Sequence, residues 1–399
     1  MAYDFDRIID RRGTDSCKWD SDPRTIEGAD YPLEDGLLPM WIADMDFEVA
    51  PEIKEALVHR AEHGVYGYTL VPDSCYEAII SWMERRHGWR VKKDWMRFVP
   101  GAVMAGHMVI QAFCHPGDKV IIQTPVYYPF YRMIFNNGAR ISRCPLTLKG
   151  DRYEIDFEEF ERCAADPRAS FFILCSPHNP VGRVWTREEL TRLGEICRRN
   201  HVHVLSDELH CDIIMPGHKH IPFASVNEEN SAGSITAIAP SKTFNLAGLQ
   251  ATVIITPDPE LRRRLDNVLE SNSVSRPNLF AITAMEAAYS RCEKWVDEMN
   301  AYVSGNYEYL KKAMAQRLPK VRVMPLEGTY LAWLDFRAME PDGKKLQQRM
   351  LTKAKIWLDE GWLFGPEGSG FERVVLACPR RYVEDAVDRF AEAFAAASL

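Results

Sequence analysis

The sequence Ala-Pro-Ser-Lys-Thr-Phe-Asn-Leu-Ala-Gly-Leu, residues 239–249, follows a short apolar run at residues 235–238. Such a run is typical of a buried strand, and the Asn and Gly residues beyond it indicate a turn into a loop. Lys242 therefore stands near the end of a buried strand, where lost hydration disfavours the ammonium form and lowers its pKa. The main use of such an amine is a Schiff base with an aldehyde cofactor. The alternative for Lys242 alone is a surface lysine on a loop.

A second predicted strand ends in an acidic residue. Residues 201–206 contain Val and Leu and lead directly to Asp207. Open α/β sheets bind ligands at the carboxyl ends of their strands, so we expect this carboxylate at a ligand site. Pyridoxal 5'-phosphate (PLP) needs such a group, because an ionised Asp keeps a proton on the ring nitrogen and lets the ring accept electrons from a substrate carbanion. A helix N-cap is the alternative for Asp207.

A third predicted strand, at residues 171–175, leads into Ser-Pro-His-Asn-Pro-Val-Gly at residues 176–182. The two prolines restrict the backbone around Asn179. A fixed amide at this place can donate a hydrogen bond to the phenolic oxygen of PLP. A turn residue is the alternative for Asn179 taken singly, but the combination of Asn179, Asp207 and Lys242 favours a PLP site.

In chain order, the segments at residues 176–182, 206–210 and 241–249 resemble the fold-type I PLP enzymes of the aminotransferase superfamily. Within that superfamily the chain is similar to the cystathionine β-lyase group of carbon–sulfur lyases, the MalY/PatB group. The resemblance covers nearly the whole chain. The segments that favour the lyase group or continue the likeness are residues 12–20, 38–47, 63–69, 124–130 and 370–380.

The order of apolar runs predicts an α/β fold. From about residue 98 to residue 256 they alternate with helical stretches, which predicts a largely parallel sheet covered by helices on both faces. After about residue 295 the pattern indicates a smaller α+β domain. The resemblance implies aminotransferase fold type I, with a mostly parallel sheet of the seven-stranded type. We expect an N-terminal arm at 1–47 that joins the small domain, a large PLP-binding domain at 48–294, and the small domain at 295–399.

Two helices carry clear signals at their ends. One is predicted from Asp73 to His87, with Asp73 as its N-cap and Gly88 beyond its last turn. The other starts at Thr186, where Glu189 completes a capping box.

The resemblance implies a set of cofactor-binding residues. Ala102 and Val103 precede a helical stretch, and the N–H groups of a helix N-terminus suit the phosphate. An aromatic face at Tyr127 would stack on the pyridine ring, with a core tyrosine as the alternative. His210 stands where many aminotransferases have tyrosine. The cofactor-binding residues we expect are Tyr68, Ala102, Val103, Tyr127, Asn179, Asp207, His210, Ser241 and Lys242.

Tyr68 matches the tyrosine that, in relatives, reaches the phosphate of the neighbouring subunit, and Tyr66 is its alternative. The resemblance therefore implies a homodimer with active sites at the interface. At two positions the superfamily often has residues that bind the phosphate, a serine and an arginine. This chain has Ala239 in place of the serine and Gln250 in place of the arginine. Phosphate binding then depends on Ser241, the turn at 102–103 and Tyr68.

Arg373 is the predicted partner of the substrate α-carboxylate, because a guanidinium group makes two parallel hydrogen bonds to a carboxylate. Arg380 is the rival for this role, and a surface salt bridge is the alternative for either. The resemblance places Ala43 beside the same carboxylate, in contact through its N–H. Val375 replaces an asparagine that relatives often carry, which leaves the carboxylate geometry open.

The resemblance implies a PLP-dependent carbon–sulfur lyase that acts on an amino-acid substrate: cystathionine, cysteine or an S-substituted cysteine. Lys242 would take the α-proton, and α,β-elimination would yield thiol, pyruvate and ammonia. An aminotransferase shares each step up to the loss of the α-proton, so it remains the alternative function.

Composition excludes several other classes. The formal net charge is −8 without a long basic run, so we expect no nucleic-acid partner. No apolar stretch approaches the roughly 18–20 residues of a membrane span. Ten scattered cysteines and a charged N-terminus indicate a cytoplasmic protein. His218 and His220 are expected in a solvated turn, and no metal site is predicted.

Overall fold

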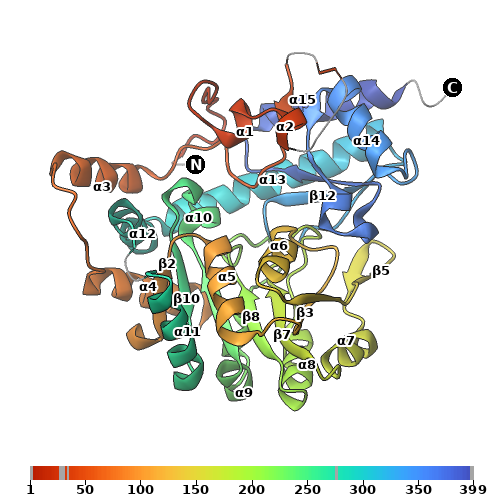
Figure 1. Ribbon diagram of the computed structural model, residues 1–399. Helices are drawn as coiled ribbons and strands as arrows, with labels where there is room; N and C mark the ends of the chain where they lie inside the picture. Colours follow the sequence, from red (N-terminus) through yellow and green to blue (C-terminus); the bar gives the residue numbers. More distant parts are fainter. Residues whose placement is uncertain (1–2, 27–31, 34–35, 275–276, 396–399) are drawn as a thin grey trace.

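A seven-stranded sheet forms the centre of the larger part of the molecule (Figure 1), in the order β2-β10-β9-β8-β7-β3-β4. The computed structural model describes residues 3–26, 32–33, 36–274 and 277–395. Within the sheet only β10 is antiparallel to its neighbours, so the predicted mostly parallel sheet is confirmed. The strands are β2 (Met96–Val99), β3 (Lys119–Ile122), β4 (Arg140–Arg143), β7 (Ala169–Cys175), β8 (His203–Asp207), β9 (Ser234–Ile238) and β10 (Thr252–Ile255).

Helices cover both faces of this sheet. Successive side chains of one strand point to opposite faces, and on each face they pack against a different set of helices. Val120 and Ile122 of β3 pack with α5 (Ala102–Phe113), α6 (Pro129–Asn136) and α11 (Pro259–Ser271). Ile121 packs instead with α7 (Phe157–Ala164) and α8 (Arg187–Arg199). The other helices of the larger part are α3 (Pro51–Glu62), α4 (Asp73–His87), α9 (Glu228–Ala232), α10 (Pro240–Thr243) and α12 (Leu279–Arg291).

A second, four-stranded antiparallel sheet lies in the smaller part, in the order β11-β12-β15-β14. The N-terminal segment joins this part, since β1 (Leu38–Pro39) pairs with β13 (Ile356–Trp357). The limits of the predicted domains stay predictions. The remaining elements are α1 (Cys17–Asp20), α2 (Pro23–Ile26), β5 (Thr147–Lys149), β6 (Arg152–Glu154), α13 (Glu293–Arg317), β11 (Arg322–Val323), β12 (Leu331–Asp335), α14 (Gly343–Arg349), β14 (Asp359–Glu360), β15 (Phe371–Val375) and α15 (Arg380–Ala395).

Local sequence signals located several helix ends. Helix α4 has the predicted span, and Gly88 ends it in the left-handed conformation with φ 67°. The N-cap prediction is wrong by one residue, because Pro72 occupies the cap and Asp73 is the first helical residue. The capping box of α8 is confirmed, with Thr186 and Glu189 each bonding the backbone N–H of the other.

The carboxyl ends of β7, β8 and β9 meet at one edge of the large sheet. Asp207 pairs in register with Cys175 on one side and with Ala237 on the other. The loops that leave these strands therefore start side by side. Among the described residues, no helix is both long and apolar enough to cross a membrane.

Candidate active site

A cavity of about 330 Å³ lies at this edge of the sheet. Most of the predicted site residues surround it, although they come from six separate segments of the chain. The predicted residues that line the cavity are Ala43, Ala102, Val103, Tyr127, Asn179, Asp207, His210, Ser241 and Lys242. Tyr68 and Arg373 are the two predicted site residues that do not line it.

Lys242 lies on α10, directly after β9. Residues 240–243 form one helical turn, where the sequence indicated a loop. The Lys242 Nζ donates a hydrogen bond to the Ala43 carbonyl oxygen at 2.7 Å. Burial, reinforced by the positive charge of Arg373, lowers the pKa of Lys242 to about 8. The amine is thus much more readily deprotonated than an ordinary lysine.

Asp207 is a half-buried carboxyl that forms no ion pair with any of the described residues. Its one hydrogen bond to the described residues comes from the Leu209 N–H at 3.3 Å, and no cationic side chain of those residues lies within 4 Å. Burial raises the pKa of Asp207 to about 6. A buried ionised carboxylate is costly without a partner, so the site is chemically suited to a ligand that brings a protonated nitrogen.

Asn179 and Arg373 meet behind the cavity. The Asn179 Oδ1 accepts a hydrogen bond from Arg373 at 3.1 Å, and the Asn179 carbonyl accepts one from the Tyr127 N–H at 3.1 Å. The Arg373 side chain is buried on β15, where it also donates to the Trp41 carbonyl at 2.7 Å and pairs with Asp359. Arg373 therefore has buried partners on its own chain, although its Nε has no acceptor among the described residues.

One end of the cavity carries the donors that suit a phosphate. The first N–H groups of α5, at Ala102 and Val103, have no partners inside their helix. Gly101 precedes them with φ +85°, and a Cβ added there would lie 2.4 Å from Gln250 Oε1. The positive φ favours glycine here, and the end of the Gln250 side chain lies over the start of α5. Gln250 therefore brings an amide to the phosphate end of the cavity. In the sequence, this residue was noted only because it replaces an arginine.

The rest of the lining is uncharged and includes the rings of Tyr127 and His210. Tyr127 packs edge-on against Phe130, with ring centroids 5.5 Å apart. His210 is buried against the ring of Tyr330 at 5.7 Å, and its Nδ1 has no hydrogen-bond partner among the described residues. Burial, together with the positive charge of Lys242, lowers the pKa of His210 far below its ordinary value. His210 is therefore a neutral imidazole beside Lys242.

Three predicted or rival residues lie away from the cavity. Tyr68 is 94% exposed, and Tyr66 packs against Phe280 at 5.5 Å on its own chain. Arg380 donates its Nε to Asn306 at 2.6 Å. The structure thus brings Arg373, and not Arg380, next to Asn179.

Ala43 contributes a carbonyl group to the site. That oxygen accepts hydrogen bonds from Lys242 and from the Tyr330 hydroxyl, the latter at 2.9 Å. The predicted donor, the Ala43 N–H, makes no hydrogen bond within the described part of the chain, so it is still available to a ligand.

Sequence reasoning missed Asp212, which lies behind α10. Its carboxylate accepts hydrogen bonds from Thr243 at 2.8 Å and Trp82 at 3.0 Å, and it lies 2.8 Å from His87 Nε2. Asp212 thus fixes the residue after Lys242. The Asp212, His87 and Cys211 ligand atoms lie within 4.8 Å of one another. The predicted absence of a metal site stays a prediction.

His220 corrects a second expectation. The sequence indicated a solvated turn, but His220 is buried and its Nε2 lies 2.9 Å from Glu208 Oε2. Glu208 also accepts hydrogen bonds from Ser206 and from the Phe223 N–H. His220 therefore belongs to a buried network that holds the residues after β8.

The residues of the cavity fit PLP. A desolvated amine, a desolvated carboxyl that forms no ion pair with the described residues, helix N–H groups and the Tyr127 ring match its aldehyde, ring nitrogen, phosphate and ring face. The fold and this donor set define a PLP enzyme of fold type I. Residues 38–390 match the aminotransferase class I and II model, and the chain belongs to that family.

Known relatives place the chain in the carbon–sulfur lyase group of that family. Cystathionine β-lyase PatB of Bacillus subtilis is 45% identical over 385 residues, which are 96% of this chain and 98% of PatB. Protein MalY of Escherichia coli is 33% identical, with 96% of this chain and 97% of MalY covered. The crystal structure of cystalysin from Treponema denticola, which contains PLP, superposes with a TM-score of 0.94 at 36% identity, covering 99% of this chain and 100% of cystalysin.

Proposed function

We propose that this protein is a PLP-dependent carbon–sulfur β-lyase. It cleaves cystathionine, cysteine or an S-substituted cysteine by α,β-elimination to thiol, pyruvate and ammonia. The observation that carries the proposal is the desolvated Lys242 amine in one cavity with the Asp207 carboxyl, which forms no ion pair with the described residues, in a chain 45% identical to a cystathionine β-lyase. The carbon–sulfur lyase relatives favour elimination over transamination.

PLP, when bound, supplies an aldehyde carbon for the amine and an electron-accepting ring that stabilises negative charge on the substrate α-carbon. Asp207 would hold the proton of the ring nitrogen, and Asn179 would donate to the phenolic oxygen through its amide. Ser241, Gln250 and the N–H groups at the start of α5 would bind the phosphate. Tyr127 would cover the ring, and the neutral His210 adds no second cation beside Lys242.

Lys242 moves the proton in this proposal. With a pKa of about 8, a useful fraction of the amine is deprotonated near neutral pH and can accept the α-proton. The Ala43 carbonyl holds the amine close to the cavity when it is not bonded to the cofactor. Arg373 attracts the substrate carboxylate, and its Nε is the donor that has no acceptor among the described residues. The thiolate then leaves from the β-carbon.

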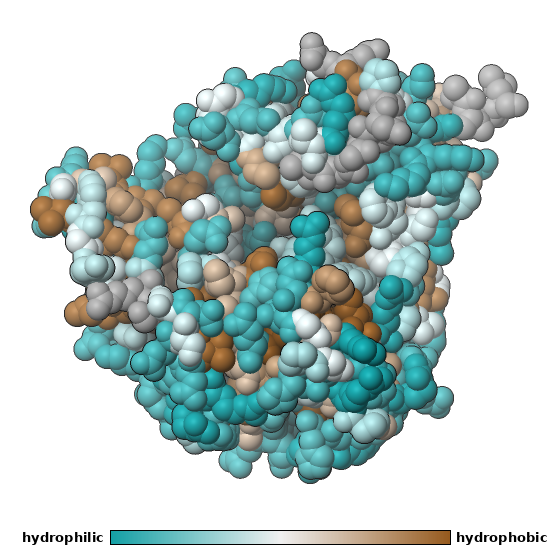
Figure 2. Space-filling view, in the orientation of Figure 1, coloured by the Kyte–Doolittle hydropathy of each residue, from teal (hydrophilic) through white to brown (hydrophobic). Residues whose placement is uncertain are grey.

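We also propose that the active unit is a homodimer. Large apolar and aromatic side chains of the loop at residues 63–72 are exposed, and so are two at the rim of the cavity; they are Val65, Tyr66, Tyr68, Leu70, Val103 and Met104. Figure 2 shows apolar side chains over α3, beside this loop, and over α5 and α6. A second copy would bury these groups and bring its Tyr68 to the phosphate end. Ten free cysteines suit a reducing compartment, so we place the enzyme in the cytoplasm.

The test is turnover of L-cystathionine by the purified, PLP-loaded protein. Pyruvate and thiol should form without any added keto acid, while the absorbance of the bound cofactor returns to its starting form. Conversion of the cofactor to its amine form, with turnover only when a keto acid is supplied, would overturn the lyase proposal. That outcome would make the protein an aminotransferase.

A further inference from the structure

Residues 41–47, which we call the strap, touch both of the side chains predicted to handle the substrate. The Ala43 carbonyl accepts the hydrogen bond of the Lys242 amine at 2.7 Å. Two residues earlier, the Trp41 carbonyl accepts one from Arg373 at 2.7 Å. The position of the strap therefore sets the position of Lys242 and of Arg373 together.

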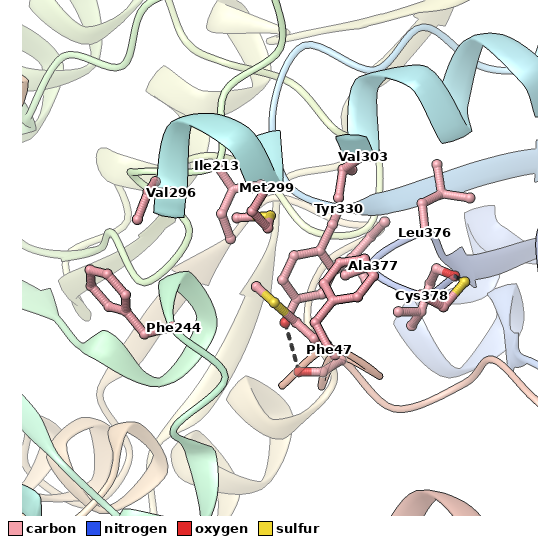
Figure 3. Packing of buried hydrophobic residues seen from close by; sticks show 14 of the residues in the cluster. Phe47, Ile213, Phe244, Val296, Met299, Val303, Tyr330, Leu376, Ala377 and Cys378 are labelled. Carbon is pink, nitrogen blue, oxygen red and sulfur yellow. Dashed lines mark hydrogen bonds between the residues drawn. The ribbon is translucent and has the colours of Figure 1, made fainter. Parts of the chain in front are cut away.

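The strap contains no helix or strand, so other contacts must hold it. Asn245 binds it from the Lys242 side, accepting the Met45 N–H at 2.9 Å and donating to the Met45 and Phe47 carbonyls at 3.0 and 3.1 Å. The Phe47 ring packs in the core beside Tyr330 (Figure 3), whose hydroxyl bonds the Ala43 carbonyl. These contacts fix one side of the strap.

A buried charge cluster fixes the other side. The Lys18 side chain is fully buried and reaches Asp46 Oδ2 at 2.6 Å and the Asp44 carbonyl at 3.3 Å. Arg11 binds Asp46 at 2.8 Å and Asp44 at 2.7 Å. Trp19 donates its indole N–H to Asp46 at 2.8 Å. Residues 12–20 and 38–47 carried part of the resemblance to the lyase group, yet the cavity lining takes only Ala43 from them.

Stability alone does not account for this cluster. Removing Lys18 and Asp46 from water costs more than an exposed pair would, and well-packed apolar residues often stabilise a fold as well or better. A buried pair does impose one geometry, because each charge must meet its partner. Directly after the strap, Glu48 forms an exposed ion pair with Arg7 at 3.1 Å, which supplies a matched comparison.

We propose that Lys18 and Asp46 are positioning residues for proton transfer. They hold the strap so that the Ala43 carbonyl keeps the Lys242 amine directed at the substrate α-carbon, and the Trp41 carbonyl keeps Arg373 directed at the carboxylate. This inference rests on the proposed role of Lys242 as the group that moves the α-proton. That step precedes the point at which lyases and aminotransferases differ.

The experiment compares Lys18→Met, Asp46→Asn and the paired Lys18→Met/Asp46→Leu with the control Arg7→Gln. The first measurement is exchange of the α-proton of L-alanine in D₂O by the PLP-loaded enzymes, followed by NMR. We expect the cluster variants to lose about 100-fold in exchange rate at saturating alanine, since a base displaced by about 1 Å loses that much. Arg7→Gln should stay near the wild-type rate, and Lys18→Arg should recover part of the loss.

The second measurement is amide hydrogen exchange at residues 41–47, on the loaded protein and again after removal of the cofactor. In the cluster variants these amides should exchange faster in both forms, while the strands of the large sheet keep their protection. Arg7→Gln should leave the strap as protected as in the wild type.

Wild-type α-proton exchange in folded, PLP-loaded Lys18→Met and paired variants would overturn the proposal. Failure of both to fold would also overturn it, because the cluster would then serve stability. The two proposals can fail independently. If the wild-type enzyme exchanges the α-proton normally but releases no pyruvate, the lyase proposal is wrong and the proposal for Lys18 and Asp46 still stands.

Discussion

The two walls of the cavity are built in different ways. One wall comes from the ends of β7, β8 and β9, and it carries Asn179, Asp207 and Lys242 at or just beyond those ends. The other comes from the strap, which is held by side chains: Asn245 on one side and the buried Lys18 on the other. Backbone hydrogen bonds between neighbouring strands fix the geometry of the first wall, whereas a few specific side chains fix the second.

This difference separates two kinds of substitution. A change at a strand end removes a chemical group but leaves the sheet in place, so it should alter the reaction without moving the site. A change behind the strap removes no reacting group but moves Lys242 and Arg373. The predictions below concern the strand-end wall and the rim that a second copy would complete, from the largest expected effect to the smallest.

Lys242→Ala should lower pyruvate release from L-cystathionine by about 10⁴-fold, the upper end for loss of a general base. The fold should be retained, because β9 and its neighbours are unchanged, and PLP should bind without a covalent bond. The measurement is pyruvate release with the absorbance of bound PLP. Lys54→Ala, at an exposed lysine paired with Glu48, is the control. Substantial activity in Lys242→Ala would mean that another residue removes the α-proton, and residues of the strap would be tested first.

Burial of the Lys242 amine should also appear in the stability of the cofactor-free protein. The pKa falls from 10.5 to about 8 on folding, so between these values the unfolded chain binds more protons and the free energy of unfolding rises with pH. Below pH 8 both states are protonated and the full penalty applies. Lys242→Met should therefore exceed the wild type at pH 7 by on the order of 3 kcal/mol.

Urea unfolding of both cofactor-free proteins at pH 7 and pH 10 measures this effect. The stability gap should shrink at the higher pH, because the wild-type amine is then neutral in the folded state. An equal gap at both pH values would mean that the folded protein keeps Lys242 protonated and that the strand-end wall does not desolvate it.

Asp207→Asn should lower the rate of α-proton removal by about 100-fold, because a neutral amide cannot stabilise a protonated ring nitrogen. The substitution preserves size and the β8 register, so PLP should still bind. The measurement is α-proton exchange of L-alanine, with Asp207→Glu as the variant that keeps the charge. Unchanged exchange in Asp207→Asn would remove the ring nitrogen from the mechanism and leave Asp207 as a structural residue.

The strand-end wall could be predicted from sequence because its signals are local. Each of Asn179, Asp207 and Lys242 stands within a few residues of the end of an apolar run, and the edge of a parallel sheet collects such ends. The signals for the helix ends at Thr186 and Gly88 were also local, since a helix end depends on the few residues around it. The N-cap at Pro72 was missed by one position, which is the usual uncertainty of a helix end.

The strap wall could not be predicted, because its contacts join distant residues. Lys18 meets Asp46 across 28 positions, and no local pattern indicates which carboxylate a buried lysine will choose. Asp212 was missed for the same reason, since it bonds Thr243 across 31 positions. The position of the Gln250 amide over Gly101 was also not predicted. Gln250 has a left-handed backbone conformation with φ 54°, which the sequence did not indicate.

The smallest effect concerns the rim that a second copy would complete. Tyr68→Phe should weaken PLP binding by about 5-fold, the value of one hydrogen bond near 1 kcal/mol. Tyr66→Phe is the matched control, since Tyr66 packs on Phe280 of its own chain. The measurement is the PLP dissociation constant, with the oligomeric state followed by light scattering. Equal effects of both variants would show that Tyr68 has no special place at the phosphate. A Tyr68→Phe effect that persists in a monomeric enzyme would contradict the dimer, because Tyr68, 94% exposed and outside the cavity lining, contributes only through a second copy in this proposal.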